Sequence, residues 1–188
     1  MRVQFFTATS VDGYIADSNN SLDWLFQFGG GPGENYDRFI ENVGAIAMGS
    51  TTYDWVLDNE ILKDPTNAKP WMYTQPCWIV TSRELRILEG ADIRFVQGDI
   101  KPIYDEMAKV ANGKNIWVVG GGELVGKFYD QGLLDDLFLG VAPVLLGSGA
   151  PLLPRNISKP PMKLISAKTK EEGFLELHYE IVRAEQSK

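Results

Sequence analysis

The chain has 188 residues, of which 44% are hydrophobic and 23% are charged, which is typical of one folded globular domain and unlike a disordered chain. Its 18 Lys and Arg residues against 25 Asp and Glu residues give a net charge of -7, which disfavours binding to the phosphate backbone of DNA or RNA. The single cysteine excludes an internal disulfide. With neither a signal-peptide pattern nor an apolar run of about 20 residues, we expect a cytoplasmic protein that does not enter a membrane.

Short apolar runs rich in β-branched and aromatic residues predict strands that are covered on both faces. In chain order these runs are residues 3–7, 45–48, 78–81, 93–96, 116–119 and 137–141. Apolar residues at helical spacing predict helices over 35–43, 101–112 and 123–131. We expect Gly44 to end the first helix in a left-handed cap and Gly113 to end the second. Because strands alternate with helices, we expect a three-layer α/β fold around a mostly parallel sheet.

The C-terminal segment has a different pattern. Residues 162–169 and 174–182 predict an antiparallel hairpin at the edge of the sheet, which makes the sheet mixed. Alternation places Leu175, Leu177, Tyr179 and Ile181 on one face of the second strand and Glu176, His178 and Glu180 on the other. We therefore expect His178, the only histidine, to be a surface residue. A single domain is predicted over residues 1–183, followed by a flexible tail at 184–188.

The sharpest local signal is Ile-Trp-Val-Val-Gly-Gly-Gly-Glu-Leu at residues 116–124, a strand followed by three glycines and a helix start. Free N–H groups at a helix N-terminus attract phosphate, and glycines allow a close approach. The alternative is a tight turn that binds nothing. The stretch departs from the dinucleotide fingerprint at Val125, where a third glycine belongs, and from the nucleotide-triphosphate loop at Phe128, where Ser or Thr would hold magnesium.

Two other predicted strands end in polar residues. The first ends in Gly49-Ser50-Thr51-Thr52, where Ser50 suits a helix cap, and the second ends in Thr81-Ser82-Arg83. Together with the glycine loop, these ends would lie on the carboxyl edge of one sheet, where α/β folds bind ligands. Elsewhere, Asp12 suits either a turn or a substrate contact, Cys77 suits the core, and Trp24 suits a pocket wall. No cluster has metal-ligand spacing.

Five segments in this order resemble the dihydrofolate-reductase-like superfamily, and most closely the C-terminal reductase domain of the bifunctional riboflavin-biosynthesis deaminase/reductases. They are residues 8–16, 46–53, 79–83, 118–124 and 143–153. The resemblance implies a mixed sheet flanked by helices, with NADPH as hydride donor. Members of this branch are commonly homodimers, so we expect a homodimer, which the exposed hairpin would support.

The resemblance also implies a role for each matching residue. It places Ala8 and Ile15 beside the nicotinamide, Gly49, Ser50, Thr51 and Thr52 at the phosphate bridge and adenosine ribose, Thr81, Ser82 and Arg83 at the adenosine end, and Gly120, Gly121, Gly122, Glu123, Leu124 and Val125 around the pyrophosphate.

Two departures from dihydrofolate reductase bear on specificity. That enzyme usually has a basic residue at the position of Ser50, which binds the 2′-phosphate; here Arg83 would take over this contact, or the preference for NADPH is lost. It also has a pterin-binding carboxylate four residues before a phenylalanine, and counting back from Phe39 gives Asn35. This difference argues against folate, whereas the Asp12-Gly13 pair fits the riboflavin branch.

We therefore expect an NADPH-dependent reductase that transfers a hydride to a C=N or C=O bond of a small heterocyclic or ribosylamino-pyrimidine substrate, as 5-amino-6-(5-phosphoribosylamino)uracil reductase does. Asp12 would polarise the substrate, and Trp24, Asn35 and Phe39 would bind it. The alternatives are dihydrofolate reductase activity, a non-catalytic nucleotide-binding protein on the same fold, and a phosphotransferase that uses residues 121–127.

Overall fold

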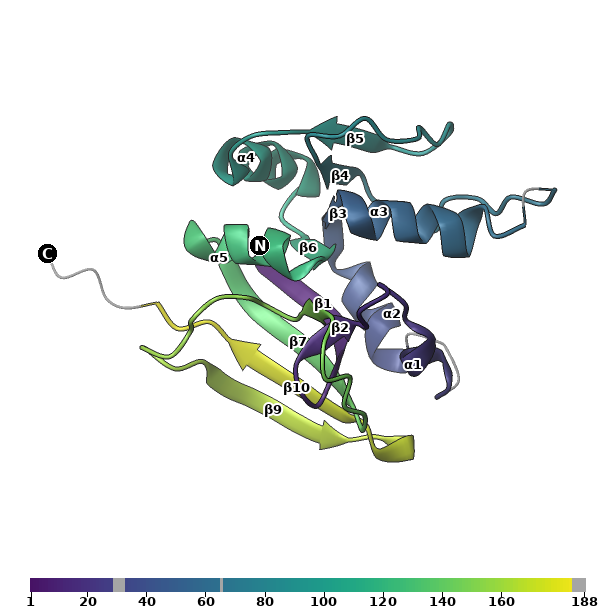
Figure 1. Cartoon of the computed structure of the whole chain (residues 1–188). Helices are drawn as coiled ribbons and strands as arrows, with labels where there is room; N and C mark the ends of the chain where they lie inside the picture. The colour runs from purple at the N-terminus through teal and green to yellow at the C-terminus, as the bar shows by residue number, and fades with distance from the viewer. Residues whose placement is uncertain (29–32, 65, 184–188) are drawn as a thin grey trace, which may run out of the picture.

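The computed structural model describes residues 1–28, 33–64 and 66–183 (Figure 1). The predicted tail at 184–188 lies outside the described residues, and so do residues 29–32 of the glycine-rich segment 29–33. The elements are β1 (Val3–Ser10), β2 (Tyr14–Ala16), α1 (Asp23–Phe26), α2 (Gly33–Glu41), β3 (Val43–Gly49), α3 (Ser50–Val56), the π-helical turn η1 (Leu57–Ile61), β4 (Cys77–Val80), β5 (Ile93–Val96), α4 (Ile100–Ala111), β6 (Asn115–Gly120), α5 (Gly122–Asp130), β7 (Leu134–Ala142), β8 (Ala150–Pro151), β9 (Lys163–Thr169), the short 3₁₀ turn η2 (Glu171–Gly173) and β10 (Leu175–Glu180).

Eight strands form one sheet in the order β5-β4-β3-β6-β1-β7-β10-β9. The first six strands in this order run parallel to their neighbours. Strand β10 is antiparallel to both β7 and β9. The predicted mixed, mostly parallel sheet with a C-terminal antiparallel hairpin is thus confirmed. A second, two-stranded sheet pairs β2 with β8.

Helices cover both faces of the large sheet and produce three layers (Figure 1). On one face, α4 and α5 bury residues such as Met107 and Phe128 against β1, β6 and β7. On the other face, α2, α3 and η1 pack against β3, β4 and β6, with Tyr53 fully buried between them. Apolar side chains on both faces of the central strands explain why these strands appear in the sequence as nearly continuous apolar runs.

The ends of two helices test the predicted glycine caps. Helix α4 ends as expected, because Asn112 and Gly113 have positive φ angles of 50° and 84°. The predicted cap at Gly44 is wrong, since α2 ends at Glu41 and Gly44 lies inside β3. A Cβ atom at Gly44 would lie 2.4 Å from the carbonyl oxygen of Ala111. The glycine therefore serves the close packing of α4 against β3 rather than a turn.

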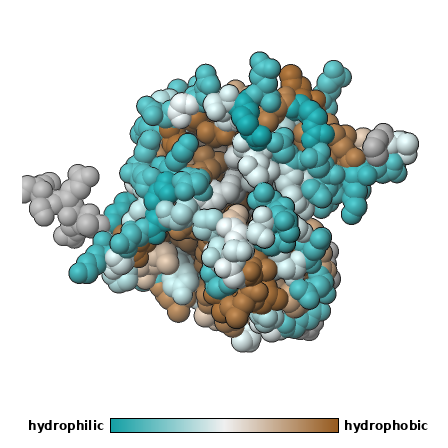
Figure 2. All heavy atoms as spheres, viewed as in Figure 1, coloured by the Kyte–Doolittle hydropathy of each residue, from teal (hydrophilic) through white to brown (hydrophobic). Residues whose placement is uncertain are grey.

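The hairpin side of the sheet is the most open part of the fold. Every residue of the edge strand β9 is exposed, and Figure 1 shows no helix over β9 and β10 on the side that carries α2 and α3. On the surface seen in Figure 2, hydrophobic residues are exposed in separate patches between hydrophilic ones. Within the described residues, no helix has the length and apolarity needed to cross a membrane.

Candidate active site

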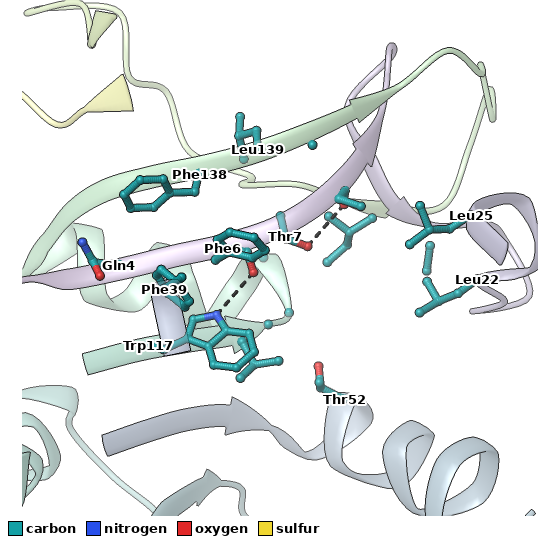
Figure 3. Close-up of a pocket in the computed structure, with 18 of the residues that line it drawn as sticks. Gln4, Phe6, Thr7, Leu22, Leu25, Phe39, Thr52, Trp117, Phe138 and Leu139 are labelled. Carbon is teal, nitrogen blue, oxygen red and sulfur yellow. Dashed lines mark hydrogen bonds between the residues drawn. The ribbon is translucent and has the colours of Figure 1, made fainter. Parts of the chain in front are cut away.

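A cleft of about 1680 Å³ runs along one face of β1 and β6, from Gln4 and Asn115 to the glycine loop, and continues over β7 and β10. Figure 3 shows part of its lining. The cleft includes the carboxyl ends of β1 and β6, the edge at which α/β sheets bind ligands. The cleft brings together residues that the sequence analysis assigned to cofactor or substrate, namely Ala8, Ile15, Phe39, Thr51, Thr52, Gly120, Gly121, Gly122 and Glu123. Segments from four separate parts of the chain thus meet at one site.

The loop between β6 and α5 presents backbone to the cleft. A Cβ atom placed on Gly121 would meet no atom within 4 Å, so this position faces open space. In the first turn of α5, the N–H groups of Leu124 and Val125 donate to the carbonyl oxygen of Gly121, at 3.0 and 3.2 Å. The N–H groups of Gly122 and Glu123 precede the first intrahelical bond, and free N–H groups at a helix N-terminus can bind a phosphate.

Two residues of this loop have a different role from the predicted one. The side chains of Leu124 and Val125 are buried in the core beneath α5, and their N–H groups are already bonded within the turn. They hold the loop in place instead of touching the cleft. Gly122 has a packing role as well, because a Cβ atom there would lie 2.3 Å from the carbonyl oxygen of Pro151.

The start of α3 forms the adjacent wall. Gly49 occupies the N-cap position of α3, and Ser50 is the first residue of the helix. No side chain makes a capping hydrogen bond at this end of the helix. The predicted capping role of Ser50 is therefore wrong, and neither Gly49 nor Ser50 lines the cleft. Thr51 and Thr52 do line it, and the hydroxyl of Thr52 lies 3.3 Å from where a Cβ atom of Gly120 would be. This hydroxyl is therefore next to the glycine loop.

The third predicted segment, Thr81-Ser82-Arg83, follows β4 and does not line the cleft. The hydroxyl of Thr81 accepts the backbone N–H of Arg83 at 2.9 Å. The guanidinium of Arg83 donates to the carboxylate of Asp54 at 2.8 Å, and about half of the arginine side chain is exposed. A ligand phosphate would have to compete with Asp54 for this cation.

Asp12 connects two loops. Its carboxylate accepts hydrogen bonds from the Ser10 hydroxyl at 2.6 Å and from the backbone N–H groups of Leu146 and Gly147 at 3.1 and 2.7 Å. The Ser10 hydrogen bond, followed by the backbone ones, lowers the pKa of Asp12. The residue is exposed and does not line the cleft. This geometry supports the turn-forming alternative, and the substrate-polarising role stays a prediction.

Sequence analysis missed the aromatic wall of the cleft, which consists of Phe6, Trp117 and Phe138 besides the predicted Phe39 (Figure 3). The Phe39 ring centroid lies 4.7 Å from that of Phe6 and 5.5 Å from that of Trp117. The Trp117 indole N–H donates to the carbonyl oxygen of Phe6 at 3.3 Å, which holds the indole in place. Large aromatic residues on three adjacent strands were the available signal, but the runs that contain them were interpreted only as strands covered on both faces.

Two other residues were predicted to bind the substrate, Trp24 and Asn35. Trp24 does not line the cleft, whereas its neighbours Leu22, Leu25 and Phe26 do. The side chain of Asn35 lies outside the described residues, although its backbone belongs to α2. Helix α1 therefore contributes Phe26 instead of Trp24, and the Phe26 ring stacks on Trp55 of α3, which also lines the cleft, with centroids 6.1 Å apart.

The prediction that His178 is a surface residue is wrong. It lines the cleft, and only 24% of its side chain is exposed. Its Nε2 donates to the carboxylate of Asp136 at 3.0 Å, and its ring stacks on Phe138 with centroids 4.1 Å apart. Alternation correctly separated the two faces of β10, but β7 carries Phe138 beside His178 and turns that second face into the cleft wall.

Asp136, which sequence analysis also missed, is the centre of a buried polar cluster. Its side chain is 3% exposed and accepts hydrogen bonds from Arg2 at 2.6 and 2.8 Å and from Gln4 at 3.0 Å. Burial alone raises the pKa of this carboxyl, but the hydrogen bonds from Arg2, His178 and Gln4 outweigh it and hold the pKa below its usual value. An aspartate in the buried strand 134–142 was the signal that could have revealed it.

Comparisons with known proteins place this architecture in a family. The family model for the RibD C-terminal domain matches residues 1–175. Among curated proteins, the uncharacterized protein YwjB of Bacillus subtilis is 30% identical over 175 residues, which cover 93% of this chain and 94% of YwjB.

Solved structures share the fold over nearly the whole chain. A putative riboflavin biosynthesis protein from Shewanella sp. PV-4 is 26% identical with a TM-score of 0.78, over 97% of this chain and 100% of that one. A deaminase/5-amino-6-(5-phosphoribosylamino)uracil reductase from Thermotoga maritima is 14% identical with a TM-score of 0.62, over 96% of this chain and 56% of that one. A dihydrofolate reductase from Enterococcus faecalis, complexed with NADP(H), is 12% identical with a TM-score of 0.58, over 95% of this chain and 94% of that one. With a dihydrofolate-reductase-like fold and a family match along nearly its whole length, the chain belongs to the RibD C-terminal domain family.

Proposed function

We propose that this protein is an NADPH-dependent reductase that transfers a hydride to a C=N or C=O bond of a small heterocyclic or ribosylamino-pyrimidine substrate. The observation that carries the proposal is the single cleft in which the free N–H groups at the start of α5 face the same space as Ala8 and an aromatic wall. The family is a reductase domain, and the related structures named above include a phosphoribosylaminouracil reductase and a protein bound to NADP(H).

The residues present fit a dinucleotide. The open space at Gly121 leaves room for a phosphate that a side chain would fill, and the N–H groups of Gly122 and Glu123 would bind its oxygens. The hydroxyl of Thr52 borders the same loop. When bound, the nicotinamide would supply the hydride. The chain's own contribution is binding, orientation and exclusion of water.

The sheet offers space for two stacked rings beside this loop. Ala8 of β1 pairs with Gly140 of β7, so two small residues lie side by side in the cleft. The next pair on the same face of the sheet, two residues toward the amino end, is Phe6 with Phe138, both aromatic. A planar ring over Ala8 and Gly140 would therefore lie against Phe6 and Phe138, in the offset or edge-on arrangements that aromatic rings prefer.

The deciding experiment is a titration of the whole chain with NADPH and NADH, without magnesium, followed by energy transfer from tryptophan to nicotinamide and by thermal stability. We expect saturation, with a gain of about 2.7 kcal/mol in the free energy of unfolding at one hundred times the dissociation constant. Oxidation of NADPH is then measured with 5-amino-6-(5-phosphoribosylamino)uracil as the substrate. If neither nucleotide binds, the proposed function is refuted.

Cofactor preference can be tested on one arginine. Arg83 is the cation that would meet the 2′-phosphate, so Arg83→Gln should weaken NADPH binding about tenfold and leave NADH binding unchanged. Arg86→Gln is the matched control, because Arg86 makes a similar exposed ion pair with Asp58. If Arg83→Gln and Arg86→Gln weaken NADPH binding equally, Arg83 has no specific role at the 2′-phosphate.

Two rival functions predict other results. A nucleotide-binding protein without catalysis would bind NADPH but turn over no substrate. A phosphotransferase would need Lys127 near the nucleotide, but Lys127 lies in α5 and does not line the cleft, and the following Phe128 is fully buried. Binding of ATP that depends on magnesium would be the result in its favour.

We also propose that the protein is a homodimer. The seven-residue strand β9 is exposed along its length and forms an edge of the sheet, and an unpaired edge can accept a strand from a second copy. The molar mass in solution, measured by light scattering, should correspond to two chains. A monomeric mass at micromolar concentration would refute the dimer and leave the reductase proposal intact.

A further inference from the structure

The part of the cleft farthest from the glycine loop has a polar wall. It is formed by β9 and β10, where Ser166 pairs with His178 and Lys168 pairs with Glu176. All four residues line the cleft. They alternate with residues that face the opposite side of the hairpin, such as Leu177. One face of the hairpin therefore carries a hydroxyl, an ammonium, a carboxylate and an imidazole into the same space.

The imidazole of His178 is held in one orientation. Nε2 donates to Asp136 at 3.0 Å, and the ring lies nearly parallel to Phe138, at an interplanar angle of 18°. Asp136 cannot move with it, because its buried carboxylate also accepts hydrogen bonds from Arg2 and Gln4. Within residues 1–28, 33–64 and 66–183, no hydrogen-bond partner of Nδ1 is found. This nitrogen is left for a ligand, and it donates when the ring is protonated.

A cation lies diagonally across the strand pair from this imidazole. Lys168 makes no ion pair with any residue in the described part of the chain, although it lines the cleft. Glu176, opposite Lys168, has its charge matched by Lys170 at 3.5 Å. Diagonal neighbours on adjacent strands are about 7–8 Å apart, within reach of a long side chain. An oxyanion in the cleft, over this face of β9 and β10, can therefore contact His178 and Lys168 together, with the Ser166 hydroxyl beside them.

We propose that Ser166, Lys168 and His178 form a subsite for a phosphate monoester at the end of the substrate remote from the nicotinamide. This inference rests on the proposed function, because it assumes that the substrate ring lies over Ala8 and Gly140. His178 lies two residues along the strands from the row of Ala8, in the row of Phe6 and Phe138, and two strands away from Ala8. At about 3.4 Å per residue and 4.8 Å per strand, the two backbones are roughly 12 Å apart, which is the span of a heterocycle that carries a sugar phosphate.

The experiment uses ribose 5-phosphate as the probe and neutral ribose as its control. Because His178 is the only histidine of the chain, its C2 proton gives one isolated NMR resonance that reports directly on this wall. Binding constants are measured by calorimetry for the native chain, His178→Gln, Lys168→Gln and Lys163→Gln. Lys163→Gln is the matched control, since Lys163 is on the same strand, is exposed, pairs with Glu180 and does not line the cleft.

We expect ribose 5-phosphate to shift the histidine resonance to saturation and ribose to leave it unchanged. Lys168→Gln and His178→Gln should each weaken binding about tenfold or more, as expected when a charge-assisted hydrogen bond is lost. Lys163→Gln should bind like the native chain. Equal weakening in Lys168→Gln and Lys163→Gln, or an unresponsive histidine, would overturn the subsite.

The same titrations separate this inference from the function on which it rests. A chain that binds NADPH while its histidine ignores ribose 5-phosphate keeps the reductase proposal and loses the subsite. A chain that binds ribose 5-phosphate through Lys168 but takes up neither nucleotide keeps a sugar-phosphate site and loses the reductase proposal.

Discussion

Replacing Asp136 by asparagine tests the buried polar cluster behind the cleft. The carboxylate accepts two hydrogen bonds from Arg2, one from Gln4 and one from His178, at 2.6 to 3.0 Å. Asparagine has nearly the same shape, but it lacks the negative charge and places an amide NH₂ where one oxygen accepts two donors. At least two hydrogen bonds are lost, and the Arg2 guanidinium is left without its closest counter-charge.

The size of the effect follows from burial. Removing one partner of a fully buried ion pair costs about 3–5 kcal/mol. Here Asp136 is 3% exposed but Arg2 is 43% exposed, so water can partly solvate the unpaired guanidinium, and Glu180 remains at 3.0 Å from it. We therefore expect Asp136→Asn to lower the free energy of unfolding by about 2–4 kcal/mol. For a chain of this length, that lowers Tm by roughly 5–15 °C.

The loss should depend on pH in a defined direction. The pKa of Asp136 in the folded chain is below its ordinary value of 3.8, so the folded state favours the ionised carboxyl. Its contribution to stability is complete at neutral pH and disappears as the pH falls below about 4 through the folded pKa. The difference between the native chain and Asp136→Asn should therefore shrink in acid.

The assay is urea unfolding followed by tryptophan fluorescence, at neutral pH and at several acidic values. Asp92→Asn is the control, because Asp92 forms an ion pair with Arg94 at 3.0 Å in which both side chains are at least 40% exposed. This control should lose less than about 1 kcal/mol. If Asp136→Asn is no less stable than Asp92→Asn, or if its deficit persists in acid, the reasoning about this cluster is refuted.

Three further results are expected. Gly122→Ala should lower the free energy of unfolding by about 2 kcal/mol or more, because its methyl group would lie 2.3 Å from a backbone oxygen. Gly126→Ala in the same helix should cost less, because its methyl group would meet the movable end of the Arg155 side chain. Equal losses for the two variants in chemical denaturation would contradict this reasoning. Asp12→Asn should depress turnover and leave NADPH affinity within a few-fold, and unchanged turnover would leave Asp12 only its role in joining two loops. Burial raises the pKa of the Cys77 thiol to about 12, so Cys77 should react with thiol reagents in urea but not in the native chain; rapid native labelling would be inconsistent with this burial.

Several features could be predicted from the sequence because their causes are local. The run 116–124 places a strand, three glycines and a helix start next to one another, and the structure has β6, the loop and α5 there. The end of α4 follows from Asn112 and Gly113, which adopt left-handed angles readily. Periodicity also separated the two faces of β10 correctly, because side chains of a strand alternate whatever lies beside it.

Other features were decided only by the tertiary structure, because they depend on residues far apart in the chain. Gly44 follows a helix and was interpreted as its cap, but it is required by the approach of Ala111. Arg2 and Asp136 are 134 residues apart, and no local pattern pairs them. Alternation shows that His178 and Leu177 face opposite sides, but not which side a neighbouring element covers. The position of β7 and of Phe138 beside β10 settles that question and makes His178 part of the cleft.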